Sequence, residues 1–193
     1  MLQRALVRQE IPLRYSQGFN PRPRMSLPLP RSVGVGSDDE VLCAMVEFDG
    51  DYDLDDIRQG LSRQLPDQCV IKEVSIRPLK VTLQPLSAVY EFSVKPSAIT
   101  ENLTASLRAL QKAAGGKMPV IVERKSGKRK SFRRVDVSAY IGSLELEDGN
   151  YRVKCMITPS GSIRIDELMQ QLGITAKDLS GPVKRTSVQW SDC

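Results

Sequence analysis

The pattern that decides the expected fold begins with residues 89–116, VYEFSVKPSAITENLTASLRALQKAAGG. Its first seven residues read as a β-strand, because apolar and polar side chains alternate along them. A helix is expected from about Ala98, with Gly115-Gly116 as its end. Its apolar stripe consists of Ile99, Leu103, Leu107 and Leu110. The stretch therefore predicts a strand followed by an amphipathic helix.

The residues after this stretch predict further strands and one more helix. The expected elements are strands at 119–124 and 131–137, a hairpin of 144–147 with 151–157 around Asp148-Gly149, a helix with Ile165, Leu168, Met169 and Leu172 on one face and Gly173 after it, and a strand at 183–190. The order is βαβ, a β-hairpin elaboration, and then αβ.

The residues before it predict the order αββαβ. The expected elements are a helix at 2–9, an edge strand at 25–30, a central strand at 42–48, a helix that Asp53 caps and Pro66 ends, and a strand at 70–76. Strand 25–30 is expected at an edge because its two prolines, two positions apart, both lack the N–H on the same side of the strand. Strand 42–48 is expected at the centre because it is apolar on both faces. Both orders suit an antiparallel sheet with helices on one face.

The expected fold class is therefore α+β, with two tandem ferredoxin-like halves. The first half spans residues 1–80 and lacks its opening strand, residues 81–88 form a linker, and residues 89–193 form the second half. A single larger α+β sheet is the alternative.

Composition limits the chemistry of this chain of 193 residues, which has a net charge of +5 and no histidine. Without histidine, Ser-His-Asp, Cys-His and HExxH chemistry is excluded. No G-x-x-x-x-G-K-[ST] loop is present, so nucleotide hydrolysis is not expected. The four cysteines are scattered singly, which predicts reduced thiols and neither a zinc site nor a disulfide framework. No cofactor is expected.

No apolar run approaches the roughly 20 residues of a membrane span. The N-terminal residues also lack the apolar segment of a signal peptide, because Arg4 and Arg8 interrupt their leucines. We therefore expect a cytoplasmic protein with no membrane partner.

Two basic segments are candidates for binding. The first is YSQGFNPRPR, residues 15–24, in which Gly18 permits positive φ while Pro21 and Pro23 fix φ and remove N–H donors. Such a stiffened loop holds Arg22 and Arg24 out from the backbone at low entropic cost. The second is residues 124–134, RKSGKRKSFRR, which suits either a polyanion or an ordinary solvated hairpin tip.

A family resemblance rests on the first of these segments and its neighbours. Residues 15–26, Leu29-Pro30 and Val33-Gly34-Val35 resemble the hallmark of the radical SAM-linked family. Further similarity lies in Val135-Asp136-Val137, Leu144-Glu145-Leu146, Asp166-Glu167-Leu168, Leu172-Gly173 and Lys184-Arg185-Thr186. That family is a domain of unknown function found beside or fused to radical S-adenosylmethionine proteins of the cobalamin-binding type. Its members are encoded near ribonuclease G-type and ribosomal-protein genes, which implies RNA metabolism and a radical SAM partner.

The resemblance also sets limits. Members typically begin with an extra strand and a Ser-His turn that are missing here, so we expect Met1 to be an internal or misassigned start. A radical SAM cluster needs three closely spaced cysteines, whereas the nearest pair, Cys43 and Cys69, is 26 residues apart. The chain is therefore expected to be a non-catalytic accessory module.

Three functions follow, in order of preference. The first is binding of tRNA or rRNA, with arginine and lysine on phosphates and Tyr15 or Phe19 stacked on an unpaired base. Core packing is the other interpretation of both aromatic residues, and it is the preferred one for Phe19. The second is docking to the radical SAM enzyme. The candidate residues for either are Tyr15, Gln17, Gly18, Asn20, Arg22, Arg24, Lys128, Arg129, Lys130, Arg133, Arg134 and Arg185.

The third function is a metal-dependent RNA-processing enzyme. Its candidate ligands are the acidic residues Asp38-Asp39-Glu40 together with Asp49, Asp51 and Asp53. A helix start after Asp53 and a solvated acidic turn explain the same residues without a metal.

Overall fold

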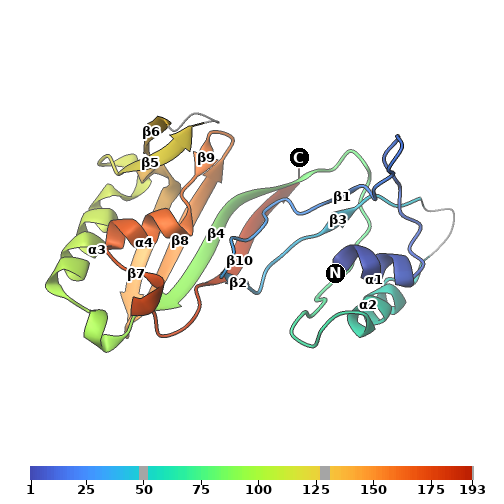
Figure 1. Ribbon diagram of the computed structural model, residues 1–193, viewed down its shortest axis with the longest axis horizontal. Helices are drawn as coiled ribbons and strands as arrows, with labels where there is room; N and C mark the ends of the chain where they lie inside the picture. Colours follow the sequence, from blue (N-terminus) through green and yellow to red (C-terminus); the bar gives the residue numbers. More distant parts are fainter. Residues whose placement is uncertain (48–51, 127–130, 193) are drawn as a thin grey trace. The chain divides into compact units, whose positions relative to one another are not determined.

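The structure is a computed structural model that describes residues 1–47, 52–126 and 131–192. These residues form a mixed α+β protein with four α-helices and a mixed six-stranded main sheet. They divide into two compact units (Figure 1). The first consists mainly of Met1–Pro28 and Val41–Thr82, and the second contains Leu29–Glu40 and Leu83–Ser191.

The helices begin and end where local sequence signals place them. They are α1 Leu2–Arg8, α2 Leu54–Arg63, α3 Glu101–Ala113 and α4 Ile165–Leu172, with short 3-10 turns at η1 Pro96–Ala98, η2 Ala114–Gly116, η3 Ser138–Tyr140 and η4 Ala176–Asp178. Asp53 caps α2 by accepting hydrogen bonds from Asp55 N and Asp56 N. The helix expected from Ala98 starts later, because Thr100 is its cap. Gly173, at φ 72°, ends α4 as expected.

The second unit contains the main sheet, whose strand order is β2-β10-β4-β8-β7, with β9 paired to β8. The strands are β2 Gly36–Ser37, β4 Leu83–Ser93, β7 Ile141–Glu147, β8 Asn150–Thr158, β9 Gly161–Ser162 and β10 Lys184–Asp192. A separate ribbon consists of β5 Ile121–Ser126 and β6 Ser131–Asp136. The expected hairpin around Asp148 and Gly149 is confirmed, since both have positive φ between β7 and β8.

Helices α3 and α4 cover one face of this sheet (Figure 1). The core between them is continuous and almost wholly apolar, with Phe92 stacked on Tyr151 at a ring-centroid distance of 5.1 Å. Leu107 of α3 and Leu168 of α4 are buried against these strands. The stripe expected on each helix therefore packs on the sheet.

Strand β4 is longer than expected. It begins at Leu83, so its first six residues occupy most of segment 81–88, which was expected to be a linker. Residues 84–88 do not look like a strand because Pro85 cannot donate a ladder hydrogen bond.

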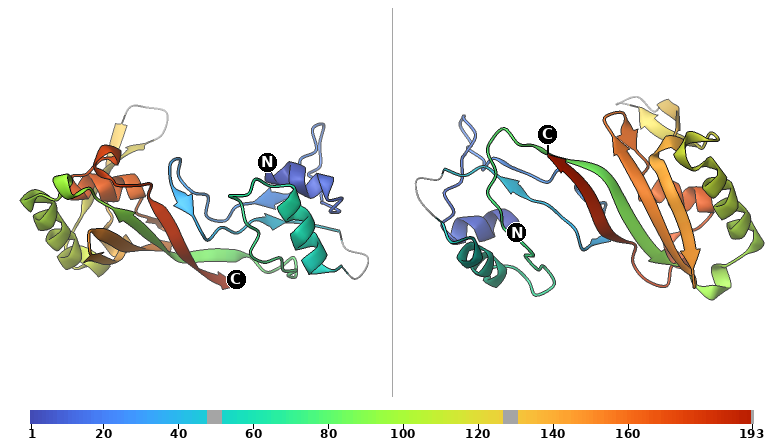
Figure 2. Two further views of the ribbon diagram at one scale, coloured as in Figure 1. Left: turned by 90° about the horizontal axis from the view of Figure 1, so that it is seen from below. Right: turned by 180° about the vertical axis from the view of Figure 1, so that it is seen from behind.

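The first unit has much less regular structure. Helices α1 and α2 lie beside each other (Figure 2), and a small core forms from Ala5, Leu6, Leu13, Leu61 and Leu65. Its strands are the two-residue pair β1 Met25–Ser26 and β3 Cys43–Ala44, and a separate isolated bridge pairs Leu13 with Val46. The tandem ferredoxin-like arrangement is not shown, and only the coarser α+β class is confirmed.

Three expected strands of this unit differ from the structure. The edge strand at 25–30 stops after Ser26, where the prolines at 28 and 30 remove ladder donors. The central strand at 42–48 is reduced to β3, which pairs with β1, and the bridge between Val46 and Leu13; its last residue lies outside the described part. The strand at 70–76 is absent, and Val70 is 73% exposed.

Segment 29–40 belongs to the second unit, although it was expected in the first half. Its strand β2 pairs in parallel with β10, with Gly36 opposite Lys184 and Ser37 opposite Arg185. This pairing makes the main sheet mixed. Within the described ranges, no helix is long and apolar enough to cross a membrane.

Candidate nucleic-acid interface

The proline-rich segment folds as a short β-hairpin, which we call the arginine hairpin (residues 14–24). Tyr15 and Pro23 form an antiparallel bridge, with Ser16 N donating to Arg22 O at 2.8 Å and Arg24 N donating to Arg14 O at 2.8 Å. A further hydrogen bond joins Arg22 N to Ser16 Oγ at 3.0 Å. These hydrogen bonds therefore hold the backbone of Arg22 and Arg24 in an extended conformation.

Strand geometry then decides where the arginines point. Side chains alternate across a strand, so Arg22 and Arg24 share one face while Pro23 and Met25 share the other. The burial agrees, because both arginines are exposed whereas Met25 packs against the first unit's core. Within the described part of the chain, no carboxylate pairs with either guanidinium. The nearby Arg14, by contrast, binds Glu47 at 3.2 Å.

The turn of the arginine hairpin exposes its aromatic residue. Phe19 is fully exposed, at 106% of the reference area, so the core packing expected for it is wrong. Tyr15 is 46% exposed and lies opposite Pro23, on the face away from Arg22 and Arg24. Gln17, Gly18 and Asn20 are also exposed, and Gly18 adopts φ 130°. The blue loop that projects from the first unit in Figure 2 is this hairpin.

The second basic segment is the β5–β6 ribbon, and its candidate arginines are not brought together. Arg133 lies opposite Arg124 and Arg134 opposite Glu123, so the two point to opposite faces. Lys128, Arg129 and Lys130 lie outside the described residues. The described part of the ribbon thus offers one exposed arginine on each face.

Arg124 has a structural role in this ribbon. Its Nε and Nη2 donate to Glu167 Oε1 and Oε2 at 2.7 and 2.8 Å, and Nη2 also donates to Ser162 O. The Glu167 side chain is 8% exposed and also accepts from Arg164 N at 2.9 Å. Burial alone would raise the pKa of Glu167, but the hydrogen bonds from Arg124 and Arg164 outweigh it and lower the pKa. The pair ties β5 to the first turn of α4.

Arg185 differs from its expected role as an exposed cation. It is 1% exposed, and its guanidinium donates to Leu29 O at 3.0 Å and Ser37 Oγ at 3.3 Å. Its Nη2 lies 2.9 Å from Glu40 Oε1, close enough for an ion pair although the N–H is not aligned for a hydrogen bond. Burial raises the pKa of the neighbouring Tyr90, partly offset by the charge of Arg185. Arg185 therefore clamps segment 29–40 onto the sheet.

The acidic residues of that segment are also engaged. Asp38 pairs with Lys184 at 2.8 Å, and Asp39 Oδ2 accepts from Val188 N at 2.7 Å. Together with the Glu40 contact, each acid thus has a protein partner. No group of three or more potential metal ligands occurs among the described residues. Asp53 is a helix cap, and Asp49 and Asp51 lie outside the described residues.

A comparison with protein-family models finds a match over most of the chain. The model of the family described as "Uncharacterized protein conserved in bacteria (DUF2344)" matches residues 1–170, which include the arginine hairpin and the β5–β6 ribbon. The chain belongs to the DUF2344 family. No curated protein and no solved structure matches it.

On the face of the main sheet away from α3 and α4, one row of side chains in this DUF2344 chain alternates in charge. Glu91, Arg152 and Glu145 lie directly opposite one another across β4, β8 and β7. Arg152 Nη1 is 3.6 Å from Glu91 Oε1. This row has no aromatic side chain and therefore lacks the stacking platform of RRM domains.

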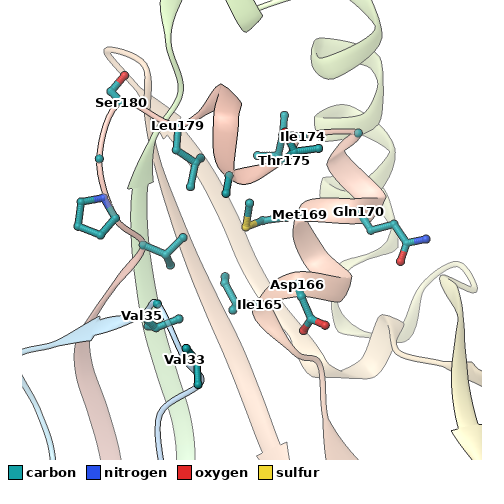
Figure 3. A pocket seen from close by; sticks show the side chains of 16 residues that line it. Val33, Val35, Ile165, Asp166, Met169, Gln170, Ile174, Thr175, Leu179 and Ser180 are labelled. Carbon is teal, nitrogen blue, oxygen red and sulfur yellow. The ribbon is translucent and has the colours of Figure 1, made fainter.

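A groove of about 870 Å³ lies elsewhere on the second unit (Figure 3). Val33 and Val35 form one wall, while Ile165 and Met169 of α4 form the other together with Leu179, which follows η4. Asp166 is its single ionisable lining residue in the described structure, so the groove suits apolar groups rather than phosphate. Sequence reasoning missed this groove, although Val33-Gly34-Val35 belongs to the motif that carries the family resemblance.

Proposed function

We propose that this DUF2344 chain binds RNA through the arginine hairpin. Arginine side chains contact phosphate by charge-assisted hydrogen bonds, and such contacts supply most of the affinity in protein–RNA complexes of this electrostatic type. The observation that carries the proposal is the exposure of Arg22 and Arg24 on one face, without a carboxylate partner among the described residues. A stabilising role for these two side chains would have left them paired or packed.

The proposal also covers the kind of protein this is and the fold of its second unit. We infer from the motif in residues 15–26 that the chain is a radical SAM-linked protein and acts as an accessory module that presents RNA to a radical SAM enzyme. We also propose that the second unit is ferredoxin-like. Its order β10-β4-β8-β7, with antiparallel β4–β8 and β7–β8 pairs and α3 and α4 on one face, supports this.

Fluorescence anisotropy against labelled tRNA and rRNA fragments, across a salt series, tests RNA binding. Each lost phosphate contact reduces the slope of log affinity against log salt by about 0.7 for single strands. We expect Arg22→Ala/Arg24→Ala to reduce the slope by about 1.4 and to weaken binding at every salt concentration. Lys72→Ala/Lys80→Ala, which removes two exposed loop charges from the same unit, is the control. Equal slopes for the two double variants would refute the proposal.

Docking to the radical SAM enzyme is the second candidate, and the apolar groove favours it. Val33, at its edge, is 105% exposed, and an exposed valine beside an apolar groove suits the side chains of a protein partner. Apolar contacts weaken little with salt, in contrast to phosphate contacts.

A pull-down of the radical SAM enzyme at raised salt tests this candidate. Val33→Asp places a charge at the edge of the groove without disturbing the core, because the native side chain contacts little. Leu79→Asp, at a position 62% exposed in the first unit, is the control. We expect the Leu79 variant to capture the enzyme and the Val33 variant to lose it. Capture by both variants would exclude docking at the groove, and so would a wild-type protein that captures no enzyme.

A further inference from the structure

The turn of the arginine hairpin has a feature that phosphate binding does not require. Phe19 is fully exposed, whereas Phe92 is buried in the core and Phe132 of the β5–β6 ribbon is 61% exposed. Burying a phenylalanine normally contributes to stability, and the ring of Phe19 contributes none of this in the free protein. A ring exposed to water at the turn of a hairpin that carries Arg22 and Arg24 suits contact with a ligand that has both an apolar face and negative charge.

The backbone presents this ring with little freedom. Pro21 and Pro23 fix φ on the C-terminal side, and the bridge between Tyr15 and Pro23 closes the base of the hairpin. Gly18, directly before Phe19, adopts φ 130°, which L-residues rarely adopt. The turn therefore has a defined course, and ordering the ring on a ligand costs little additional entropy.

We propose that Phe19 stacks on an unpaired base, so that the RNA bound by the arginine hairpin is single-stranded or an open loop. This inference rests on the proposed RNA-binding function and names its substrate class. Bases in an A-form duplex are already stacked and paired, and their faces are closed to an aromatic side chain. An unpaired base offers its face to Phe19 while its flanking phosphates meet Arg22 and Arg24.

Tyr15 is not the stacking residue in this arrangement. It lies opposite Pro23, on the hairpin face away from the two arginines. A base stacked on Tyr15 would direct its phosphates away from Arg22 and Arg24. The register of the hairpin therefore disfavours Tyr15 as the stacking residue, although the sequence had favoured core packing for Phe19 and not for Tyr15.

The test compares one RNA sequence as a single strand and as a blunt duplex, by anisotropy across a salt series. We expect Phe19→Ala to weaken single-strand binding by roughly 10-fold and to leave duplex binding unchanged. Phe19→Trp retains single-strand affinity because it keeps the aromatic face, whereas Phe19→Leu does not. Tyr15→Ala has less than half the effect of Phe19→Ala on the logarithm of affinity. None of these variants changes the salt slope, because none removes a charge.

The outcomes separate this inference from the proposed function. If the wild type prefers neither form and Phe19→Ala changes nothing, while Arg22→Ala/Arg24→Ala still reduces the salt slope, RNA binding stands and base stacking is refuted. If Phe19→Leu binds as well as the wild type, the contact is apolar rather than aromatic, which also refutes stacking. If the wild type binds neither form, both proposals fail.

Discussion

The arginine hairpin and the β5–β6 ribbon are both basic, but they present their arginines differently. In the hairpin the arginines are two residues apart, at 22 and 24, so a strand places them on one face. In the ribbon the arginines at 133 and 134 are adjacent, so the strand directs them to opposite faces. The number of basic residues is therefore a poor guide to a binding surface, and their spacing relative to the two-residue period of a strand is a better one.

The groups opposite the cations differ as well. In the ribbon, Arg124 is held by Glu167, and Arg134 has Glu123 directly opposite. In the hairpin, the described residues supply no carboxylate to Arg22 or Arg24. The ribbon thus uses the charge of Arg124 within the protein, whereas the hairpin leaves Arg22 and Arg24 available for a partner.

The largest effect is expected from breaking the ion pair that holds the ribbon. Glu167→Gln keeps the shape of the side chain but leaves the mostly buried Arg124 without a counter-charge, which typically costs about 3 kcal/mol. Urea unfolding measures the change. Glu123→Gln, an exposed position on the same strand as Arg124, is the control and should change the free energy of unfolding by less than about 0.5 kcal/mol. Equal changes for both variants would show that the ion pair is not structural.

The same pair predicts a pH dependence. The pKa of Glu167 is lowered in the folded state from its ordinary 4.5, so the folded protein holds this carboxylate ionised more strongly than the unfolded chain does. Its contribution is present above pH 4.5 and is lost as the pH falls through the lower folded pKa. The difference in unfolding free energy between wild type and Glu167→Gln should therefore shrink below pH 4.5; a difference that is constant down to pH 3 would contradict this origin.

A matched charge reversal tests the difference between the two segments directly. Arg22→Glu/Arg24→Glu and Arg133→Glu/Arg134→Glu each change the net charge by the same amount, so long-range electrostatics weaken RNA binding similarly in both. The hairpin variant should lose roughly 10-fold more affinity, because it also loses direct phosphate contacts. Anisotropy at one salt concentration measures the ratio. Equal losses would remove the distinction between the two surfaces.

The turn of the hairpin gives a smaller effect. Gly18→Ala meets no neighbour within 4 Å, but φ 130° is strained for alanine and costs about 1 kcal/mol. We expect that loss in thermal unfolding, with weaker RNA binding because the turn is displaced. Gly181→Ala also meets nothing within 4 Å and lies outside the positive-φ region, so it should be neutral. An unchanged Gly18→Ala would show that the turn relaxes freely.

Local signals predicted the elements that have local causes. Asp53 as a cap, Gly173 as a helix end and Asp148-Gly149 as a hairpin turn all act within a few residues of their positions. The strand at 70–76 was wrong because an apolar run alone does not supply a partner strand. The pairing of β2 with β10 had no local signal, since it joins residues almost 150 positions apart.

The candidate site shows the same limit. Proline and glycine predicted a stiff loop that exposes Arg22 and Arg24, and both arginines are exposed in the structure. The exposure of Phe19 was missed because phenylalanine is usually buried. Arg185 was expected among the exposed cations, and its burial depends on Leu29, Ser37 and Glu40, which are distant in sequence.

The smallest effects are expected in the ribbon, and they have opposite signs. Arg133 lies opposite Arg124, a like charge, so Arg133→Ala should stabilise the protein by a few tenths of a kcal/mol, up to about 0.5. Arg134 lies opposite Glu123, so Arg134→Ala should destabilise it by a similar amount. Paired urea titrations at low salt measure both, and added salt should reduce both differences, because the positions are exposed. Changes of the same sign would mean that the register of the ribbon does not determine what its arginines contribute.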